Sequence, residues 1–297
     1  MNELVSIVIP AFNAGRFIRR ALDGVLAQTH REWEIVVVED GTHDETESVV
    51  REFAATVSQS VRYENNGSNL GVSATRNRGM AVARGSVFAF LDADDRWTPE
   101  HLATGLEALR QGADVCFSGF HIFDESTKTV MESFVPDAGV MEHPLPRLFE
   151  SNFIQTSSLV MMRRTAADAA GGFDGGLKVG EDCDYWLRAL ALGGRLACTG
   201  KLTCCYTKHA DSAMAKTLMV AEHAVKFYRK HLKSGYLPAS LRKRHYANSL
   251  CNYGRLIARQ DPVLARALFL KAWRARPWDA RVLAYAARAG ALAWLKS

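Results

Sequence analysis

Short, almost wholly apolar runs of β-forming residues, each followed by a stretch of helical periodicity, constrain this chain most. The runs are Val5–Ile9, which Pro10 is expected to end, Glu34–Val38 and Ser86–Leu91. A strand that is apolar on both faces is typical of a parallel sheet covered by helices. Repeated strand–helix units therefore predict an α/β fold with a doubly wound, mostly parallel, Rossmann-like sheet. Helical stretches follow at residues 17–26, 44–57 and 74–84, and Thr98-Pro99-Glu100 starts a further helix, with Thr98 as its N-cap and Pro99 at its first position.

The second half of the chain changes character twice. Residues 114–165 read as short strands and helices whose order the sequence does not give, and a helix over 182–192 and a strand over 196–206 close the domain. Beyond about residue 215 only helical patterns remain, so we expect a first domain over 1–215 and an all-α extension over 216–297. In the extension Ala265, Phe269, Ala272 and Pro277 have the spacing of a tetratricopeptide unit, which cannot bury its apolar face alone.

Charge separates the two parts. Residues 1–215 hold 20 lysines and arginines against 29 aspartates and glutamates, whereas residues 216–297 hold 17 against 3. Such asymmetry predicts different partners for the two parts. The basic clusters at 228–233 and 241–245, with nearby aromatic residues, suit an anionic membrane surface. They equally suit docking on the acidic domain, and both interpretations stay open. No nucleic-acid motif is recognisable, so no nucleic-acid partner is expected.

Targeting features are few. The amino terminus has no basic region followed by an apolar core, and no apolar stretch reaches the about 20 residues that span a bilayer. The six cysteines fit neither a disulfide framework nor a zinc motif. We therefore expect a cytoplasmic protein, peripheral at the inner face of the plasma membrane if its extension binds lipid.

Three acidic motifs follow the predicted strands, at the edge where open α/β sheets bind ligands. The first is Glu39-Asp40-Gly41. A carboxylate there can accept hydrogen bonds from a nucleotide base or ribose. The same residues also suit turn formation and helix capping, so the motif alone does not decide between these roles.

The second motif, Asp92-Ala93-Asp94-Asp95, places three carboxylates together after a buried strand. Close like charges resist joint ionisation unless a cation or strong donors compensate them. Oxygen ligands of this kind suit Mg²⁺ or Mn²⁺, which are usually held by one or two carboxylates plus substrate phosphates. The alternative is helix capping ahead of Thr98.

The third motif is Gly180-Glu181-Asp182-Cys183-Asp184, which opens a helix. Acids in a first turn also interact favourably with the helix dipole. Beside a metal–phosphate site, a carboxylate here could act as general base on an acceptor hydroxyl.

Taken in order, six motifs over about residues 4–212 resemble glycosyltransferase family 2. They are Ser6 to Asn13, Ala27-Gln28-Thr29, Val38 to Gly41, Asn69 to Asn77, Leu91 to Asp95, and Gly172-Phe173-Asp174 with Gly180 to Arg188. The resemblance implies a GT-A fold. It implies an inverting enzyme that transfers a sugar from a nucleotide-diphosphate donor, a UDP-sugar, to a glycan or lipid-linked glycan in cell-surface polysaccharide synthesis.

The resemblance also implies a role for each matching residue. Pro10, Phe12, Asn13, Asp40, Arg76 and Asp92 would bind the nucleotide, with Asp40 at the base and Asp92 at the ribose and sugar. Asp94 would hold Mn²⁺ or Mg²⁺, and His209, in a segment similar to the family's Tyr-Arg-x-His-x-x-Ser, would approach the metal or diphosphate. Asp182 would be the catalytic base, with Glu181 beside it.

Two departures from the family pattern stand at the first motif, where Glu39 replaces the commoner Asp and Thr42-His43 replaces Ser-Thr. A dinucleotide-dependent oxidoreductase is excluded because the loop after the first strand lacks Gly-x-Gly-x-x-Gly. A catalytically silent sugar-nucleotide-binding or scaffold protein, acting through its helical extension, remains the alternative.

Overall fold

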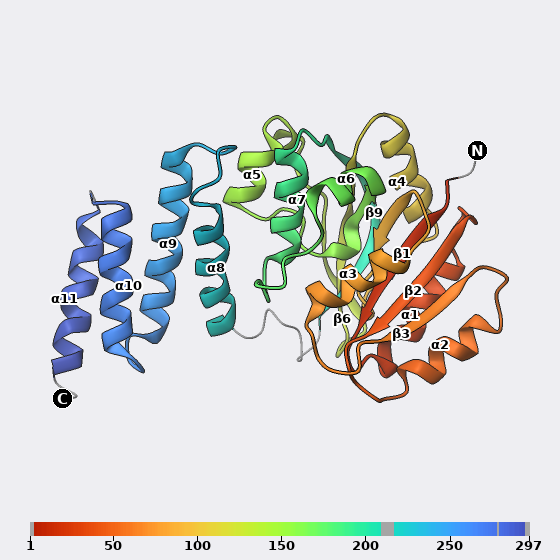
Figure 1. Cartoon of the computed structure of the whole chain (residues 1–297), viewed down its shortest axis with the longest axis horizontal. Helices are drawn as coiled ribbons and strands as arrows, with labels where there is room; N and C mark the ends of the chain where they lie inside the picture. Colours follow the sequence, from red (N-terminus) through yellow and green to blue (C-terminus); the bar gives the residue numbers. More distant parts are fainter. Residues whose placement is uncertain (1–2, 209–216, 278, 295–297) are drawn as a thin grey trace. The chain divides into compact units, whose positions relative to one another are not determined.

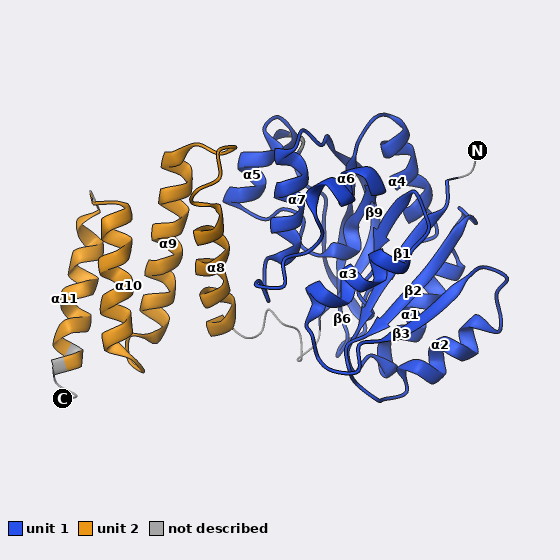
Figure 2. Ribbon diagram, in the orientation of Figure 1, with its two compact units in different colours: residues 1–210 blue, residues 211–297 orange. Residues whose placement is uncertain are grey.

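The computed structural model describes residues 3–208, 217–277 and 279–294. It forms two compact units, residues 1–210 and 211–297 (Figure 1). Figure 2 shows unit 1 in blue and unit 2 in orange. The sequence-based boundary was placed near residue 215, five residues from this division.

Unit 1 is built on one nine-stranded sheet with the strand order β3-β2-β1-β4-β8-β6-β9-β5, and β7 pairs with the far end of β6. Its first four strands are parallel to one another. They are β1 (Val5–Ala11), β2 (Trp33–Glu39), β3 (Val61–Asn65) and β4 (Val87–Phe90). Every residue of β2 and β4 is buried, as the near-continuous apolar runs predict.

The second half of the sheet is mixed. β8 runs antiparallel between β4 and β6, whereas β9 is parallel to β6. The strands are β5 (Arg96–Trp97), β6 (Val115–Asp124), β7 (Thr129–Phe134), β8 (Val160–Arg163) and β9 (Leu196–Lys208). The predicted α/β class with a mostly parallel sheet is confirmed, and the antiparallel insertion of β8 is the part that the sequence did not order.

Helices cover both faces of the sheet (Figure 1). On one side α3 packs on β1 and β2, where a Cβ on Gly79 would lie 2.6 Å from a Val8 methyl group. On the other side α1 and α2 pack against each other. The helices of unit 1 are α1 (Gly15–Leu26), α2 (Thr46–Ala54), α3 (Val72–Val82), α4 (His101–Arg110), α5 (Pro144–Glu150), α6 (Arg164–Ala170) and α7 (Glu181–Ala191), with 3₁₀ turns at Ala138–Met141 and Ser157–Leu159.

Two local expectations differ from the structure. Pro10 does not end β1: it pairs in register with Val38 inside the strand. α4 begins at His101 rather than at Thr98-Pro99, because the chain first forms the short strand β5 and a turn in which the His101 N–H donates to the Thr98 carbonyl at 3.2 Å.

The buried glutamine of the Ala27-Gln28-Thr29 motif fixes that turn. The Gln28 amide donates to the Thr98 carbonyl at 2.7 Å, and its oxygen accepts from the Leu102 N–H at 3.0 Å. The Ala27-Gln28-Thr29 motif therefore fixes the course of the backbone after the Asp92–Asp95 segment.

Unit 2 is all-helical, as predicted. It contains α8 (Thr217–His231), α9 (Ala239–Ile257), α10 (Pro262–Ala275) and α11 (Ala280–Trp294). Ala265, Phe269 and Ala272, the residues with tetratricopeptide-like spacing, are the buried face of α10, in one apolar core with α9 and α11. None of the helices within the described ranges has the length and apolar character to cross a membrane.

Close packing of α9 on α10 gives a stability prediction. A Cβ on Gly254 would lie 2.9 Å from the Phe269 ring, whereas a Cβ on Gly290 would meet only the flexible Arg266 side chain at 3.4 Å. Overpacking costs about 1–3 kcal/mol, and replacing a helical glycine by alanine gains up to about 1 kcal/mol. We expect Gly254→Ala to lower the free energy of unfolding and Gly290→Ala to leave it unchanged or raise it.

Urea denaturation of the full chain, followed through the transition in which unit 2 unfolds, measures the stability change of both variants. Equal stability of the two variants would contradict the close packing of α9 on α10.

Candidate active site

Arg76 links the second and third acidic motifs. It lies on α3 with 5% of its side chain exposed, and its guanidinium donates to Asp92 at 2.7 Å and to Glu181 at 2.9 Å. The ring of Phe173 lies 5.2 Å beneath its guanidinium carbon. Although burial acts against it, the negative charges of Asp92 and Glu181 raise the pKa of Arg76 above its ordinary value. The carboxyl end of β4 and the first turn of α7 are therefore joined by one buried cation.

Asp92 is held from a second side by the turn that precedes β8. Its backbone N–H donates to the Ser158 hydroxyl at 2.9 Å, and its carboxylate accepts from the Thr156 hydroxyl at 3.1 Å. A quarter of the Asp92 side chain, 26%, stays exposed. The carboxylate is thus oriented by protein groups while one part of it faces solvent.

Asp95 is a buried member of the same motif. It accepts from the Thr207 N–H of β9 at 2.8 Å, which ties the motif to the opposite end of the sheet. Burial, followed by the charges of Asp94 and Asp92, raises the pKa of Asp95 well above its ordinary value. Helix capping, the alternative function for this motif, is not its role here, because α4 has no side-chain cap.

Asp182 lies in the first turn of α7, partly buried, and its carboxylate accepts from the Cys183 N–H at 2.6 Å. Burial and then the negative charge of Glu181 raise the pKa of Asp182 to about 7, against the opposing attraction of Arg76. A carboxyl with a pKa near neutrality can accept a proton from a hydroxyl at physiological pH. Of the acids in this turn, Asp184 differs, because it is fully buried and paired with Arg188.

Asp40, at the end of β2, is bound by a neighbouring loop. Its two carboxylate oxygens accept from the backbone N–H groups of Leu70 and Gly71, both at 2.8 Å, and from the Asn66 amide at 2.9 Å. Gly41 follows with φ +77°, and any Cβ there would lie 2.3 Å from the backbone of Ser68. Asp40 therefore shapes the loop over residues 66–71.

Glu39 and Thr42, two of the residues that depart from the family pattern, belong to one hydrogen-bond chain. The Thr42 hydroxyl donates to Glu39 and accepts from the Asn13 N–H at 3.2 Å, and Tyr63 donates to Glu39 at 3.2 Å. Burial raises the pKa of Glu39 and, with the charge of Glu39, raises the pKa of Tyr63 to about 12. The longer Glu39 side chain thus joins Tyr63 of β3 to the loops that follow β1 and β2.

The other predicted nucleotide-binding residues lie at the end of β1. Phe12 is 53% exposed, and Asn13 adopts a left-handed φ of 50°, which asparagine tolerates better than most residues. Pro10 is half-buried inside the strand. The structure brings Arg76, Asp92, Glu181 and Asp182 into one cluster and places Pro10, Phe12, Asn13 and Asp40 at the neighbouring strand ends. His209 lies outside the described residues.

Sequence reasoning missed the groups that hold the acidic motifs. Thr156 and Ser158 are single hydroxyl residues in the region whose order the sequence does not give, and Thr207 binds through its backbone N–H, so no spacing connects these residues to Asp92 or Asp95. Asn77 stands in the fourth motif without a predicted role of its own, yet its amide exchanges hydrogen bonds of 2.8 Å with both the N–H and the carbonyl of Phe173. It thereby positions the ring under Arg76.

A divalent cation fits the Asp92–Asp95 segment. Asp92 and the half-buried Asp94 present carboxylates there. After burial, their negative charges are the next cause that raises the pKa of the neighbouring Asp95. Within the described ranges, no three His, Cys, Asp or Glu side chains converge as a complete metal site. Two carboxylates are nevertheless the usual protein contribution where substrate phosphates supply further ligands.

A parallel sheet with acidic side chains gathered at the carboxyl ends of β2 and β4 is the arrangement of nucleotide-binding α/β proteins. The family model described as glycosyl transferase family 2 matches residues 6–171, more than half of the chain. The chain belongs to glycosyl transferase family 2.

Curated relatives agree with this assignment. An uncharacterized glycosyltransferase of Rickettsia prowazekii is 30% identical over 195 residues, which cover 63% of this chain and 58% of that protein. A Bacillus subtilis glycosyltransferase named for teichuronic acid biosynthesis is 28% identical over 135 residues, 45% of this chain and 53% of its own length. The chain thus matches little more than half of the length of these relatives.

Solved structures show the fold. TarS 1-349 of S. aureus, in complex with UDP-GlcNAc, superposes with a TM-score of 0.68 at 20% identity, covering 95% of this chain and 83% of that chain. The mannosyltransferase PcManGT of Pyrobaculum calidifontis, with GDP-Man and Mn²⁺, gives 0.62 at 18% identity, covering 97% and 84%. The GT-A fold class that the resemblance implied is confirmed.

The ion pairs of Arg76 give a second stability prediction. Arg76→Ala leaves two carboxylates without their cation, and breaking a buried pair of this kind costs about 3–5 kcal/mol. Arg51→Ala is the control, because Arg51 pairs with Glu47 on the surface, 70% exposed, and such i,i+4 pairs contribute only about 0.3–0.5 kcal/mol. We expect chemical denaturation to give a much larger loss for Arg76→Ala. A loss no larger than that of Arg51→Ala would show that the Arg76 pairs do not stabilise the site.

Proposed function

We propose that this protein is a metal-dependent, inverting glycosyltransferase (EC 2.4). In this proposal it transfers a sugar from a nucleotide-diphosphate donor, a UDP-sugar, to a hydroxyl of a glycan or lipid-linked glycan during cell-surface polysaccharide synthesis. One observation carries the proposal: Arg76 binds Asp92 and Glu181 together, so the donor-side motif lies beside the first turn of α7 and its Asp182. Membership of glycosyl transferase family 2 supports the reaction class.

The donor and pathway rest on similarity. TarS, the solved neighbour with UDP-GlcNAc, supports a UDP-sugar, although the mannosyltransferase neighbour has GDP-Man. The relative named for teichuronic acid biosynthesis supports a polysaccharide acceptor.

In the proposed reaction Asp182 accepts the proton of the attacking acceptor hydroxyl. Inversion needs one displacement and therefore one base, and a pKa of about 7 lets Asp182 be partly ionised and still basic at neutral pH. Arg76 pairs with Asp92 and Glu181 and holds both side chains in place, and Asp92 orients the ribose and sugar of the donor. Pro10, Phe12, Asn13 and Asp40 line the nucleotide side at the ends of β1 and β2.

Asp92 and Asp94 are the described carboxylates that would hold Mn²⁺ or Mg²⁺, and His209 is proposed as a further ligand. The cation would neutralise the charge that develops on the departing diphosphate. The neighbour with Mn²⁺ supports metal use in this fold.

We also propose that the protein acts in the cytoplasm, peripheral at the inner face of the plasma membrane. Exposed basic side chains on α8 and α9 support this proposal, among them Arg229, Lys230, Lys243 and Arg244. Anionic lipids attract such clusters by about 1 kcal/mol per basic residue.

Vesicle sedimentation tests the membrane proposal. The full chain is expected to sediment with vesicles that contain phosphatidylglycerol, and replacing Arg229, Lys230 and Lys243 by glutamine should reduce this fraction. Unchanged sedimentation would overturn the proposal.

Nucleotide binding is the first test of the donor site. A ligand that binds only the folded protein raises its melting temperature. We expect UDP with Mn²⁺ to raise the melting temperature more than UDP alone. Asp94→Ala should lose the metal-dependent part, while Asp114→Ala, a half-buried acid on the loop before β6, should keep it. No rise with any nucleoside diphosphate would favour the silent, scaffolding alternative.

Asp182 gives a pH prediction. As a base with a raised pKa it is protonated below about pH 7, so kcat/KM for transfer should rise with pH and level off above that value. Asp182→Asn should lower kcat by about 10²–10⁴-fold with little change in the KM for the donor. Glu181→Gln removes the neighbouring negative charge and should move the acidic limb to lower pH.

The exposed Asp168→Asn is the matched control and should keep the wild-type profile. Equal transfer by wild type and Asp182→Asn would exclude Asp182 as the base.

A further inference from the structure

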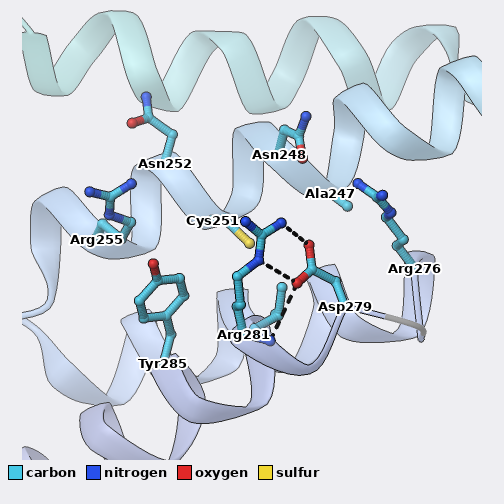
Figure 3. Close-up of a pocket in the computed structure, with 10 residues that line it drawn as sticks. Ala247, Asn248, Cys251, Asn252, Arg255, Arg276, Asp279, Arg281 and Tyr285 are labelled. Carbon is cyan, nitrogen blue, oxygen red and sulfur yellow. Dashed lines mark hydrogen bonds and ion pairs between the residues drawn. The ribbon is translucent and has the colours of Figure 1, made fainter.

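Unit 2 contains a cavity that neither the family nor the active site accounts for. It encloses about 240 Å³ between α9, the turn after α10 and the start of α11 (Figure 3). Its floor is apolar, formed by the buried Ala247 and Val282. Its rim carries three arginines, Arg255, Arg276 and Arg281.

The charge of this cavity is not balanced by its own residues. Asp279 is the one carboxylate that lines it, and both of its oxygens bind the Arg281 guanidinium at 2.9 Å. Among the described residues, no carboxylate lies within ion-pair distance of Arg255 or Arg276. Figure 3 shows these two side chains entering from opposite sides of the opening. Two cationic side chains are therefore available to a ligand.

The remaining polar groups suit a sugar. Asn248, Asn252 and Arg255 are spaced by four and three residues along α9, so they share one face of the helix, and the two amides can donate to and accept from hydroxyl groups. Tyr285, 37% exposed, lies beside Arg255 with its ring 5.9 Å from the guanidinium carbon. Guanidinium groups bind carboxylates and phosphates through paired hydrogen bonds.

We propose that this cavity, the α9–α11 pocket, binds an anionic sugar unit of the acceptor glycan through its carboxylate or phosphate oxygens. The inference rests on the proposed function, since it assumes a glycan acceptor. Electrostatics favours this occupant: residues 1–215, which hold the donor site, carry nine more acidic than basic residues, and would repel a polyanionic acceptor. A cationic pocket on the same chain, with amides for the hydroxyl groups, retains such an acceptor.

Direct binding to the full chain tests the pocket. The probes are an oligoglucuronate and a phosphodiester-linked sugar oligomer, with a neutral oligosaccharide of equal length as the blank and calorimetry or fluorescence as the readout. The pocket variant is Arg255→Gln with Arg276→Gln. The control is Lys271→Gln with Arg274→Gln, which removes the same charge from exposed positions of unit 2 outside the pocket.

We expect one of the two acidic oligomers to bind more tightly than the blank. The pocket variant should weaken this binding by at least about tenfold, because it loses charge-assisted hydrogen bonds, and the control by less than about twofold. Equal losses in both variants would mean diffuse attraction and overturn the proposal, as would acidic oligomers that bind no better than the blank.

Two further measurements separate the alternatives. If the wild type binds phosphatidylglycerol vesicles but neither oligomer, and the pocket variant loses the vesicle binding, the pocket is assigned to a lipid surface. This outcome would overturn the proposal. Donor hydrolysis without acceptor should be equal in wild type and pocket variant. Its loss in the variant would overturn the proposal, because a pocket for the acceptor has no part in hydrolysis. A wild type that neither hydrolyses a UDP-sugar nor binds UDP would contradict the proposed function instead, whatever the oligomers show.

Discussion

The buried guanidinium of Arg76 is the interaction on which the site depends. Three carboxylates cluster around it, from the end of β4 and the first turn of α7, two elements about ninety residues apart in the chain. The cation between them offsets the mutual repulsion of these groups at close range. Phe173 and Asn77 hold the guanidinium in place from below, and Thr156 and Ser158 hold Asp92 from the side. Residues of α3, α7 and the turn before β8 therefore all meet around the Arg76 guanidinium and its partner carboxylates.

The two acidic residues that open α7 illustrate how position separates roles. Glu181 pairs with Arg76, whereas burial and then the negative charge of Glu181 raise the pKa of the neighbouring Asp182 to about 7. One carboxylate therefore binds the buried cation, and the other has a pKa near neutrality. Asp184, two residues further along the helix, is fully buried and pairs with Arg188, so its role is structural. Three acids within four residues thus have three environments.

The sequence predicted the parts of the fold in which local pattern and tertiary structure agree. The runs at 34–38 and 86–91 are apolar because both of their faces are covered, so they identified β2 and β4 correctly. The helical extension could also be predicted, since Ala265, Phe269 and Ala272 repeat on one buried face. The pairing of β8 between β4 and β6 could not, because antiparallel insertion depends on contacts between strands more than seventy residues apart. The same holds for Thr207, whose backbone N–H, not its side chain, binds Asp95.

The loop that binds Asp40 determines which sequence changes this part of the fold tolerates. The main-chain N–H groups of Leu70 and Gly71 donate hydrogen bonds to the Asp40 carboxylate, and the Leu70 side chain is 58% exposed. Every residue except proline supplies the same main-chain donor, so substitutions at positions 68–70 by residues other than proline leave these hydrogen bonds in place. Gly41 fixes the path of the loop, since no side chain fits against Ser68. The surface beside Asp40 can therefore change in sequence while the backbone that supports it keeps its path.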